Sequence, residues 1–342
     1  PNTFNKKLPR EENIQNFKIK RSHVWLSLKL FFINPGIYFH MINDEQDIIH
    51  TIGIRSFQSL IAALVARKKK IPLLISDQGG LTTHPDLRTK NTWTRILYKI
   101  QSPMIQFVIN QARKIIVANE YEKKIFAELT DESKIEVVRN GINLDDMKSS
   151  VKFKKKYALD CNYFLFLGRF HKVKGVDLLL KATHLIKNHP LMSNVKLVIM
   201  GVDFGFESEM FEMIKQMQLE NVVQVIKNPP REDVIASYNE SEFLVLPSRW
   251  ELSPLTPLEG FAFKKPTIST KAHGIPYTLH DRKDSILVES EDFKELSDKI
   301  IELLNDKIKC AQLGIEGYQY VQKECNSKKM THQILNIYEK IT

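Results

Sequence analysis

Two glutamates separated by seven residues, Glu251 and Glu259, are the side chains whose types and spacing point most clearly to chemistry. They follow an apolar run, 243–247, that predicts a buried strand. Thr256 and Pro257 predict the N-cap and first residue of a helix, which places Glu259 at the capping-box position. Carboxylates on either side of such a loop can hold hydroxyl groups while the amides of the helix N-terminus hold phosphate. The alternative is that Glu259 only caps the helix and Glu251 is a solvated loop residue.

A second segment places two cations between a strand and a helix. Residues 163–167 predict a buried strand, and the amphipathic stretch 176–187 predicts a helix. Arg169 and Lys174 lie on the predicted loop between them. Arginine supplies two donors in a fixed geometry and lysine a point charge, which together suit a diphosphate, and Gly168 permits close backbone approach. The alternative is an ordinary loop with solvated cations.

Taken together, the two segments resemble the donor site of the retaining GT-B glycosyltransferases, and in particular glycosyltransferase family 4, the group 1 glycosyltransferases. The shared pattern is Gly-Arg-x4-Lys-Gly, starting at Gly168, followed by Glu-x7-Glu, starting at Glu251. Further segments are similar to family motifs: 137–143 (V-x-N-G-I/V-D), 265–276 (K-P-V-I-A-T…G-G-I-P) and, more weakly, 47–50 and 76–80. The resemblance extends over residues 45–342.

Apolar runs that alternate with amphipathic stretches predict an α/β fold, with parallel sheets covered by helices on both faces. The runs are 71–75, 114–118, 135–138, 163–167, 195–200, 222–226, 243–247 and 266–269. The resemblance implies the GT-B architecture, which is two doubly wound Rossmann-like domains facing each other across a cleft. The polar stretch 143–156 is predicted as the hinge.

Three segments are expected on this basis. Residues 1–146 form an N-terminal acceptor-binding domain, and 147–326 form a C-terminal domain that binds a nucleotide-sugar donor. Residues 327–342 form a helix that crosses back to the first domain. The strand and glycine-rich loop with which the family usually begins are not recognised, so we expect the first domain to lack its first strand.

The resemblance also assigns roles to side chains. Arg169 and Lys174 neutralise the diphosphate of the donor and stabilise it as a leaving group, which is electrostatic stabilisation of developing charge. Glu251 contacts hydroxyl groups of the transferred sugar, and Glu259 binds the ribose. The other expected donor-binding residues are Gly168, Ser253, Pro254, Leu255 and Thr256. Weaker candidates for lining the cleft are Gln78, Gly79 and His273. Gln78 stands where the family often has a histidine, so a base role is lost at that position.

The implied activity is transfer of a hexose from a UDP- or GDP-linked sugar to a glycan or lipid-linked acceptor, with retention of anomeric configuration. Such a reaction serves the synthesis of cell-surface polysaccharide, glycolipid or glycoprotein glycans. Neither a metal nor another cofactor is expected, because GT-B enzymes use cationic side chains and helix ends instead. Two alternatives stay open: a catalytically inactive relative that binds nucleotide sugars, and a nucleotide-sugar 2-epimerase.

Composition limits the remaining possibilities. A hydrophobic content of 43% and a charged content of 26% are usual for soluble globular proteins, and no apolar run is long enough to cross a bilayer. The first residues lack the apolar core of a signal peptide, and the three cysteines lack metal-site spacing, so we expect a cytoplasmic protein with reduced thiols.

The net charge of +10 lies mainly in residues 1–150. Either this is a solvated surface, in which the run 67–70 closes a helix, or it attracts the anionic inner face of the membrane. Nucleic acid is not an expected partner, because basic and aromatic residues are not interleaved.

Overall fold

The computed structural model describes residues 8–28, 31–77, 79 and 92–342. The chain divides into two compact units. Unit 1 runs to Val138 and also includes Gln333–Thr342, and unit 2 comprises Arg139–His332. Each unit is described by itself.

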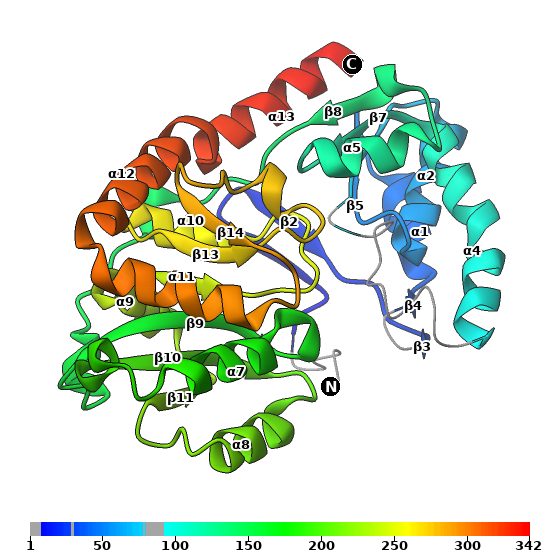
Figure 1. Cartoon of the computed structure of the whole chain (residues 1–342). Coiled ribbons are helices and arrows are strands. Elements are labelled where there is room, and N and C mark those ends of the chain that lie inside the picture. The colour runs from blue at the N-terminus through cyan, green and yellow to red at the C-terminus, as the bar shows by residue number, and fades with distance from the viewer. Residues whose placement is uncertain (1–7, 29–30, 78, 80–91) are drawn as a thin grey trace. The chain divides into compact units, whose positions relative to one another are not determined.

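Unit 2 is built on a six-stranded parallel sheet (Figure 1). Its strands are β9 (Asn162–Phe170), β10 (Val195–Asp203), β11 (Val223–Lys227), β12 (Leu244–Leu246), β13 (Thr267–Thr270) and β14 (Ser285–Val288). Their order in the sheet is β11-β10-β9-β12-β13-β14. The direction in which strands are added therefore reverses between β9 and β12. Ligands of open α/β sheets bind at such a switch point, outside the carboxyl ends of the strands.

Both faces of this sheet are buried within unit 2. Along β9, Phe164 and Phe166 join one apolar cluster, whereas Tyr163 and Leu165 join another on the opposite face. The first cluster is completed by α7 (Val176–Ile186), α8 (Glu207–Gln216) and α11 (Phe293–Asn305). The second is completed by α9 (Arg231–Glu240), α10 (Leu255–Ala262) and α12 (Lys307–Glu324). The predicted α/β fold with helices on both faces of a parallel sheet is confirmed.

Unit 1 contains a parallel sheet in which the strands follow the order of the chain, β5-β6-β7-β8. These strands are β5 (Ile49–Ile52), β6 (Leu73–Ser76), β7 (Ala112–Val117) and β8 (Ile135–Val137). Unit 1 also contains the helices α1 (Gly36–Asn43), α2 (Phe57–Lys69), α4 (Thr92–Gln111) and α5 (Glu120–Ala127). Ile75 and Ile115 of the sheet pack in one apolar core with residues of α2, α4 and α5.

Each of the predicted strands is present in the structure, with its ends shifted by a few residues. Two short antiparallel hairpins were not predicted: β1 (Glu11–Ile14) with β2 (Phe17–Lys20), and β3 (Leu26–Leu28) with β4 (Phe31–Ile33). Their strands are only three or four residues long, and β1 is mostly polar, so the sequence carries little alternation there.

Short helical turns and two further helices complete the described elements. The turns are η1 (Glu132–Lys134), η2 (Leu144–Asp146), η3 (Lys172–Lys174), η4 (Pro190–Asn194) and η5 (Ile275–Tyr277). The helices are α6 (Phe153–Lys156) and α13 (Ser327–Ile341). The end of α13 belongs to unit 1, where the Tyr338 hydroxyl lies 2.6 Å from Nδ1 of His50.

The stretch 143–156, predicted as a hinge, is instead packed within unit 2. Met147 and Phe153 are buried in its apolar core. The carboxylate of Glu240 accepts hydrogen bonds from the amides of Phe153 and Lys154, at 2.7 and 2.9 Å. The boundary between the units falls between Val138 and Arg139. The prediction was wrong because it followed the polar residues of this stretch. Two buried apolar side chains among them hold the stretch in place.

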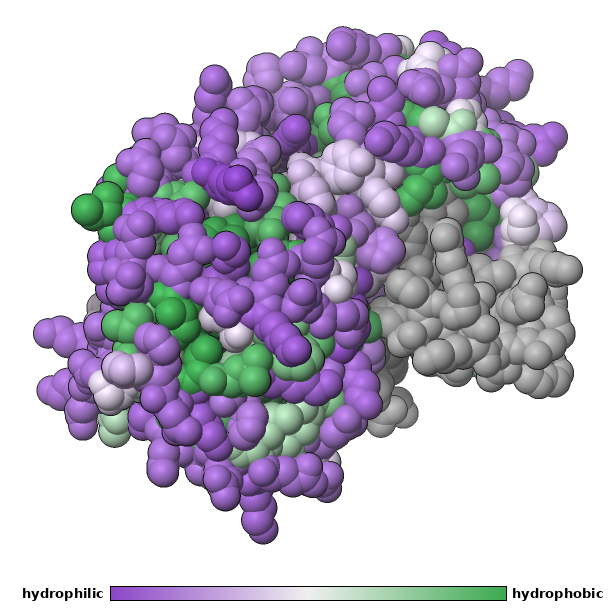
Figure 2. Space-filling view, viewed as in Figure 1, coloured by the Kyte–Doolittle hydropathy of each residue, from purple (hydrophilic) through white to green (hydrophobic). Residues whose placement is uncertain are grey.

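The surface is largely hydrophilic on the face drawn in Figure 2, with hydrophobic residues in separate patches. Within the described ranges, no helix combines the length and the apolar character that a membrane crossing requires. All three cysteines are free thiols, and Cys310 and Cys325 are buried.

Candidate functional site

Arg169 lies at the carboxyl end of β9, next to the switch point of unit 2. The strand continues through Phe170, because Gly168 and Arg169 still pair with Gly201 and Val202 of β10. The prediction that Arg169 belongs to the following loop is therefore wrong. The Arg169 side chain is exposed, and its guanidinium lies over the ring of Phe204 at 5.0 Å from the centroid. The strand thus presents a cation at the sheet edge where ligands bind.

The loop after β9 is held against the end of β12 by a close backbone approach at Gly175. This residue has a positive φ of 70°, and a Cβ there would lie 1.9 Å from the carbonyl oxygen of Pro247. Only glycine fits. On the other side of η3, Nδ1 of His171 accepts a hydrogen bond from the amide of Val173. His171 is therefore a cap of the turn that carries Lys174.

Lys174 and Glu251, predicted for different parts of the donor, form an ion pair. Their side chains are only 14% and 13% exposed. The hydroxyl of Ser248 also donates to Glu251, at 3.3 Å. The loops that follow β9 and β12 thus bring a cation and a carboxylate together at the switch point.

Arg249 joins these loops to the rest of unit 2 and was not predicted. Its guanidinium donates two hydrogen bonds to Asp177 of α7, at 2.6 and 2.8 Å, and one to the carbonyl oxygen of Lys172 at 2.5 Å. It also pairs with Glu291. The hydrogen bond to Asp177 is the main reason that the pKa of Arg249 is raised. The signal available in the sequence was its position two residues before Glu251.

Two further family-like segments hold the loop from Glu251 to Thr256. A Cβ at Gly274 would lie 2.0 Å from the carbonyl oxygen of Leu252, and the Gly274 amide donates to the carbonyl oxygen of Glu251 at 3.0 Å. The Asn140 side chain donates to the carbonyl oxygen of Ser253 at 3.3 Å. The loop is therefore fixed by backbone contacts.

His273, a weaker candidate, has a left-handed backbone with φ of 51°. Its ring centroid lies 6.4 Å from that of Trp250 in the same loop region. The structure thus places His273 beside the residue that precedes Glu251.

The helix that carries Glu259 begins earlier than predicted. α10 starts at Leu255 with Pro254 as N-cap, and no side chain caps it. The predictions that Thr256 is the N-cap and Glu259 a capping-box residue are wrong. Proline is tolerated throughout a first helical turn, so Pro257 does not mark the start. The amides of Leu255 and Thr256 lie in the uncapped first turn, where an anion is favoured.

Glu259 instead has two donors from α9. Its Oε1 accepts a hydrogen bond from Arg231 and its Oε2 one from the hydroxyl of Tyr238, both at 2.6 Å. This hydrogen bond to Glu259 is the main reason that the pKa of Arg231 is raised. Burial, followed by the charge of Glu259, raises the pKa of Tyr238 well above its usual value. No local sequence pattern signals this contact, because it joins residues of two helices.

In unit 1, Gln78 lies outside the described residues, and Gly79 follows β6 with a positive φ of 88°. A buried carboxyl pair lies nearby. Asp77 accepts a hydrogen bond from the amide of Ile54, and Glu122 accepts one from the amide of Ala118 at 2.7 Å. Burial, with a contribution from the charge of Asp77, raises the pKa of Glu122 to about 7.

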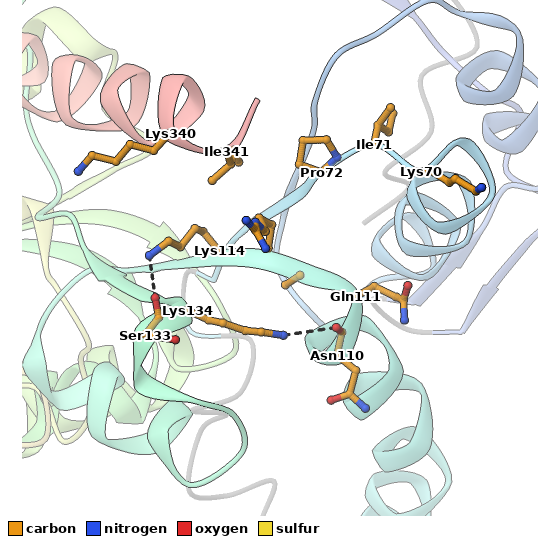
Figure 3. A pocket seen from close by; sticks show the side chains of 12 residues that line it. Lys70, Ile71, Pro72, Asn110, Gln111, Lys114, Ser133, Lys134, Lys340 and Ile341 are labelled. Atoms are coloured by element: carbon orange, nitrogen blue, oxygen red, sulfur yellow. Dashed lines mark hydrogen bonds between the residues drawn. The ribbon is translucent and has the colours of Figure 1, made fainter.

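Figure 3 shows a pocket in unit 1, with a volume of about 670 Å³, that was not predicted. The cations that line it are Lys70, Arg113, Lys114, Lys134 and Lys340. Lys114 and Lys134 donate to the carbonyl oxygens of Ser133 and Asn110 (Figure 3). The ends of α2, α4 and α13 meet here, so part of this positive charge offsets the negative ends of helix dipoles.

Among the described residues, histidine, cysteine, aspartate and glutamate side chains do not gather in groups of three that could hold a metal ion. At the edge of unit 2, positive charge comes from Arg169 and Lys174 and from the first turn of α10.

Comparison with known proteins adds to this geometry. The family model described as Glycosyltransferase Family 4 matches residues 4–146, and the model described as Glycosyl transferases group 1 matches residues 148–320. An uncharacterized glycosyltransferase of Methanocaldococcus jannaschii is 26% identical over 83% of this chain and 73% of its own length. The capsular polysaccharide biosynthesis glycosyltransferase CapM of Staphylococcus aureus is 28% identical over 63% of this chain and 58% of its own length. The chain thus spans little more than half of CapM.

Solved structures show the fold. Sucrose-phosphate synthase of Thermosynechococcus elongatus superposes with a TM-score of 0.78 and 18% identity, covering 98% of this chain and 86% of that protein. Anabaena HepE in complex with UDP-glucose gives a TM-score of 0.73 and 16% identity, covering 89% of this chain and 81% of that protein. These neighbours have the GT-B fold. On the strength of both family matches, the chain belongs to the group 1 glycosyltransferases, with a family 4 N-terminal half.

Proposed function

We propose that this chain transfers a hexose from a UDP- or GDP-linked sugar to a glycan or lipid-linked acceptor, with retention of anomeric configuration. The observation that carries the proposal is the Lys174–Glu251 pair at the switch point of unit 2. The structure of HepE with UDP-glucose and the name of CapM support the donor class and a role in cell-surface polysaccharide synthesis.

In this proposal the diphosphate of the donor binds between Arg169 and Lys174. Lys174 has three donors and gives one to Glu251, which leaves two for phosphate oxygens. As the bond to the sugar breaks, negative charge grows on the diphosphate, and positions that already carry cations stabilise it. The first turn of α10 adds the positive end of a helix dipole.

Glu251 is proposed to accept hydrogen bonds from hydroxyl groups of the transferred sugar, through the lone pairs that Lys174 and Ser248 do not use. The loop that carries it is fixed by the contacts of Gly274 and Asn140, so the carboxylate is already in place when the sugar arrives. Reaction without a metal is part of this proposal, because the cations and the helix end supply the charge that a metal otherwise supplies.

The first test is a thermal-melt comparison of wild type and Arg169→Ala with UDP, GDP and the corresponding sugars. A ligand at 100 times its dissociation constant should stabilise the folded protein by about 2.7 kcal/mol. We expect one nucleotide class to raise the melting temperature of wild type and to lose most of this effect in Arg169→Ala. A well-folded wild type that responds to no nucleotide contradicts the proposed donor site.

Transfer is tested separately, with the nucleotide sugar that binds and a panel of glycan and lipid-linked acceptors. Proton NMR of the product should show the anomeric configuration of the donor. Binding without transfer to any acceptor would instead support a nucleotide-sugar-binding relative that is inactive. Conversion of the donor to its 2-epimer would support an epimerase.

We also propose that the basic residues of unit 1 attract an anionic membrane surface at the inner face of the membrane. Five cations line the pocket of Figure 3 and support this, although one of them, Lys114, is paired with Glu136. Each cation near such a surface contributes about 1 kcal/mol. Co-sedimentation with anionic vesicles, but not with neutral ones, is the expected result, and equal recovery with both contradicts it.

A further inference from the structure

Two residues of α9, Arg231 and Tyr238, hold the carboxylate of Glu259 by its two different oxygens. The Arg231 guanidinium donates to Oε1 and the Tyr238 hydroxyl to Oε2, at 2.6 Å each. A carboxylate bound by one donor can rotate about its terminal bond. Two donors from one helix, one on each oxygen, fix its plane.

The three side chains differ in exposure, and the side chain of Glu259 keeps a small exposed fraction. Tyr238 is fully buried in the apolar cluster beneath α9 and α10 and stacks on Phe263. The side chain of Glu259 is 15% exposed and that of Arg231 is 56% exposed. Each carboxylate oxygen has two lone pairs, so one acceptor position remains on each. Two adjacent hydroxyl groups can therefore donate to one fixed carboxylate.

Toward the carboxylate of Glu259, the hydroxyl group of Tyr238 acts as the donor. Burial and the neighbouring charge of Glu259 raise the pKa of Tyr238 well above its usual value, so it keeps its proton. Arg231 has donors only. A ligand hydroxyl must then bind Glu259 as a donor, which is what a vicinal diol such as that of ribose provides.

We propose that Arg231 and Tyr238 are positioning residues that orient Glu259 for the ribose diol and so set a preference for ribonucleotides over 2′-deoxyribonucleotides. This inference rests on the proposed donor site in unit 2. Arg231 and Tyr238 act through Glu259, so their removal should change the selectivity for the diol and leave the binding of the diphosphate unchanged.

The test measures dissociation constants by titration calorimetry for UDP, 2′-deoxy-UDP, GDP, 2′-deoxy-GDP and inorganic pyrophosphate. The variants are Arg231→Ala, Arg231→Lys and Tyr238→Phe. Arg282→Ala, whose side chain is 88% exposed, and Tyr318→Phe of α12 are matched controls. Arg231 is largely exposed, so its variants should fold even if Tyr238→Phe does not.

For wild type, the nucleotide class that binds should favour the ribose form about tenfold, as expected for one hydrogen bond to a charged group. Arg231→Ala and Tyr238→Phe should bring this ratio below about threefold, Arg231→Lys should restore part of it, and the controls should keep it. Pyrophosphate should bind all of the proteins equally.

Other outcomes separate the two ideas. A wild type that binds ribonucleotide and discriminates, with variants that discriminate equally well, overturns the positioning role and leaves the donor site intact. An equal loss of affinity for both nucleotide forms and for pyrophosphate also overturns it, because the residues would then be structural. A wild type that binds no nucleotide overturns both.

Discussion

Lys174 and Glu251 are 77 residues apart in the sequence and form an ion pair at the switch point of unit 2. The pair exists because β9 and β12 are neighbours in the sheet although three helices and two strands separate them along the chain. Two groups proposed to touch different parts of one ligand therefore also contact each other. Each side chain limits where the other can lie.

Substitution of either member of this pair should affect different steps. Lys174→Ala should weaken UDP or GDP binding by about 10- to 100-fold, because a hydrogen bond to a charged phosphate is lost. Glu251→Gln should keep nucleotide affinity within about threefold and lose transfer activity, because its proposed contact is with the sugar. Calorimetry and a transfer assay measure both. An equal loss of nucleotide affinity in the two variants would contradict the separate roles proposed for Lys174 and Glu251.

The guanidinium of Arg249 should contribute to the stability of unit 2. Arg249→Ala leaves Asp177, whose side chain is 14% exposed, without the two hydrogen bonds from the guanidinium, so we expect a loss of about 2 kcal/mol in the free energy of unfolding. Arg249→Lys should recover only part, because lysine cannot donate in a fork. Urea denaturation measures the loss, with Arg282→Ala as the control. Equal stability of the two alanine variants would show that the hydrogen bonds of Arg249 make no net contribution to the free energy of unfolding.

Gly175 and Gly205 provide a matched pair for the close approach between the loops. Both have positive φ, 70° and 93°, but a Cβ at Gly205 meets nothing within 4 Å. Gly205→Ala should lower the free energy of unfolding by about 1 kcal/mol, because a residue with a Cβ is strained in a left-handed backbone conformation. Gly175→Ala should cost at least about 3 kcal/mol, because the Pro247 carbonyl must also move. Thermal melts compare the two, and similar shifts would mean that the approach is easily relieved.

Glu122 should make stability fall as the pH rises from about 4.5 to 7. Burial raises the pKa of Glu122 to about 7 in the folded protein, compared with 4.5 without burial. Between these pH values the folded state holds a proton that the unfolded state has already released. Raising the pH therefore favours the unfolded state. The free energy of unfolding falls by roughly 3 kcal/mol up to pH 7, and this loss changes little above that pH.

Glu122→Gln keeps an acceptor for the amide of Ala118 and removes the titration. Urea denaturation of wild type and this variant at pH 5 and pH 7.5 measures the difference. We expect the variant to gain stability relative to wild type at pH 7.5. A difference between the two proteins that does not change with pH would show that Glu122 titrates normally.

The parts predicted from the sequence were those determined by local patterns. Apolar runs such as 163–167 and 243–247 are strands because they are buried on both faces, and polar residues directly after them had to lie at one edge of the sheet. The start of α10 was misplaced because Pro254 and Pro257 are both compatible with a helix N-terminus, and local sequence does not choose between them.

The contacts that hold the site were not predicted, since they depend on packing between distant elements. Arg231 reaches Glu259 across 28 residues, and Arg249 reaches Asp177 across 72. A single cation near the start of a helix has no recognisable partner in the sequence. The stretch 143–156 was mistaken for a hinge for the same reason, because its burial depends on residues such as Glu240.

The sheet of unit 2 is covered on both faces by helices of the same unit. All of the residues proposed to contact the donor, from Gly168 to Glu259, belong to it. In the proposed function, substitutions that alter the choice of nucleotide or sugar are therefore expected within unit 2. Chimeras that exchange residues 139–332 between relatives should consequently acquire the donor preference of the protein that supplies this segment.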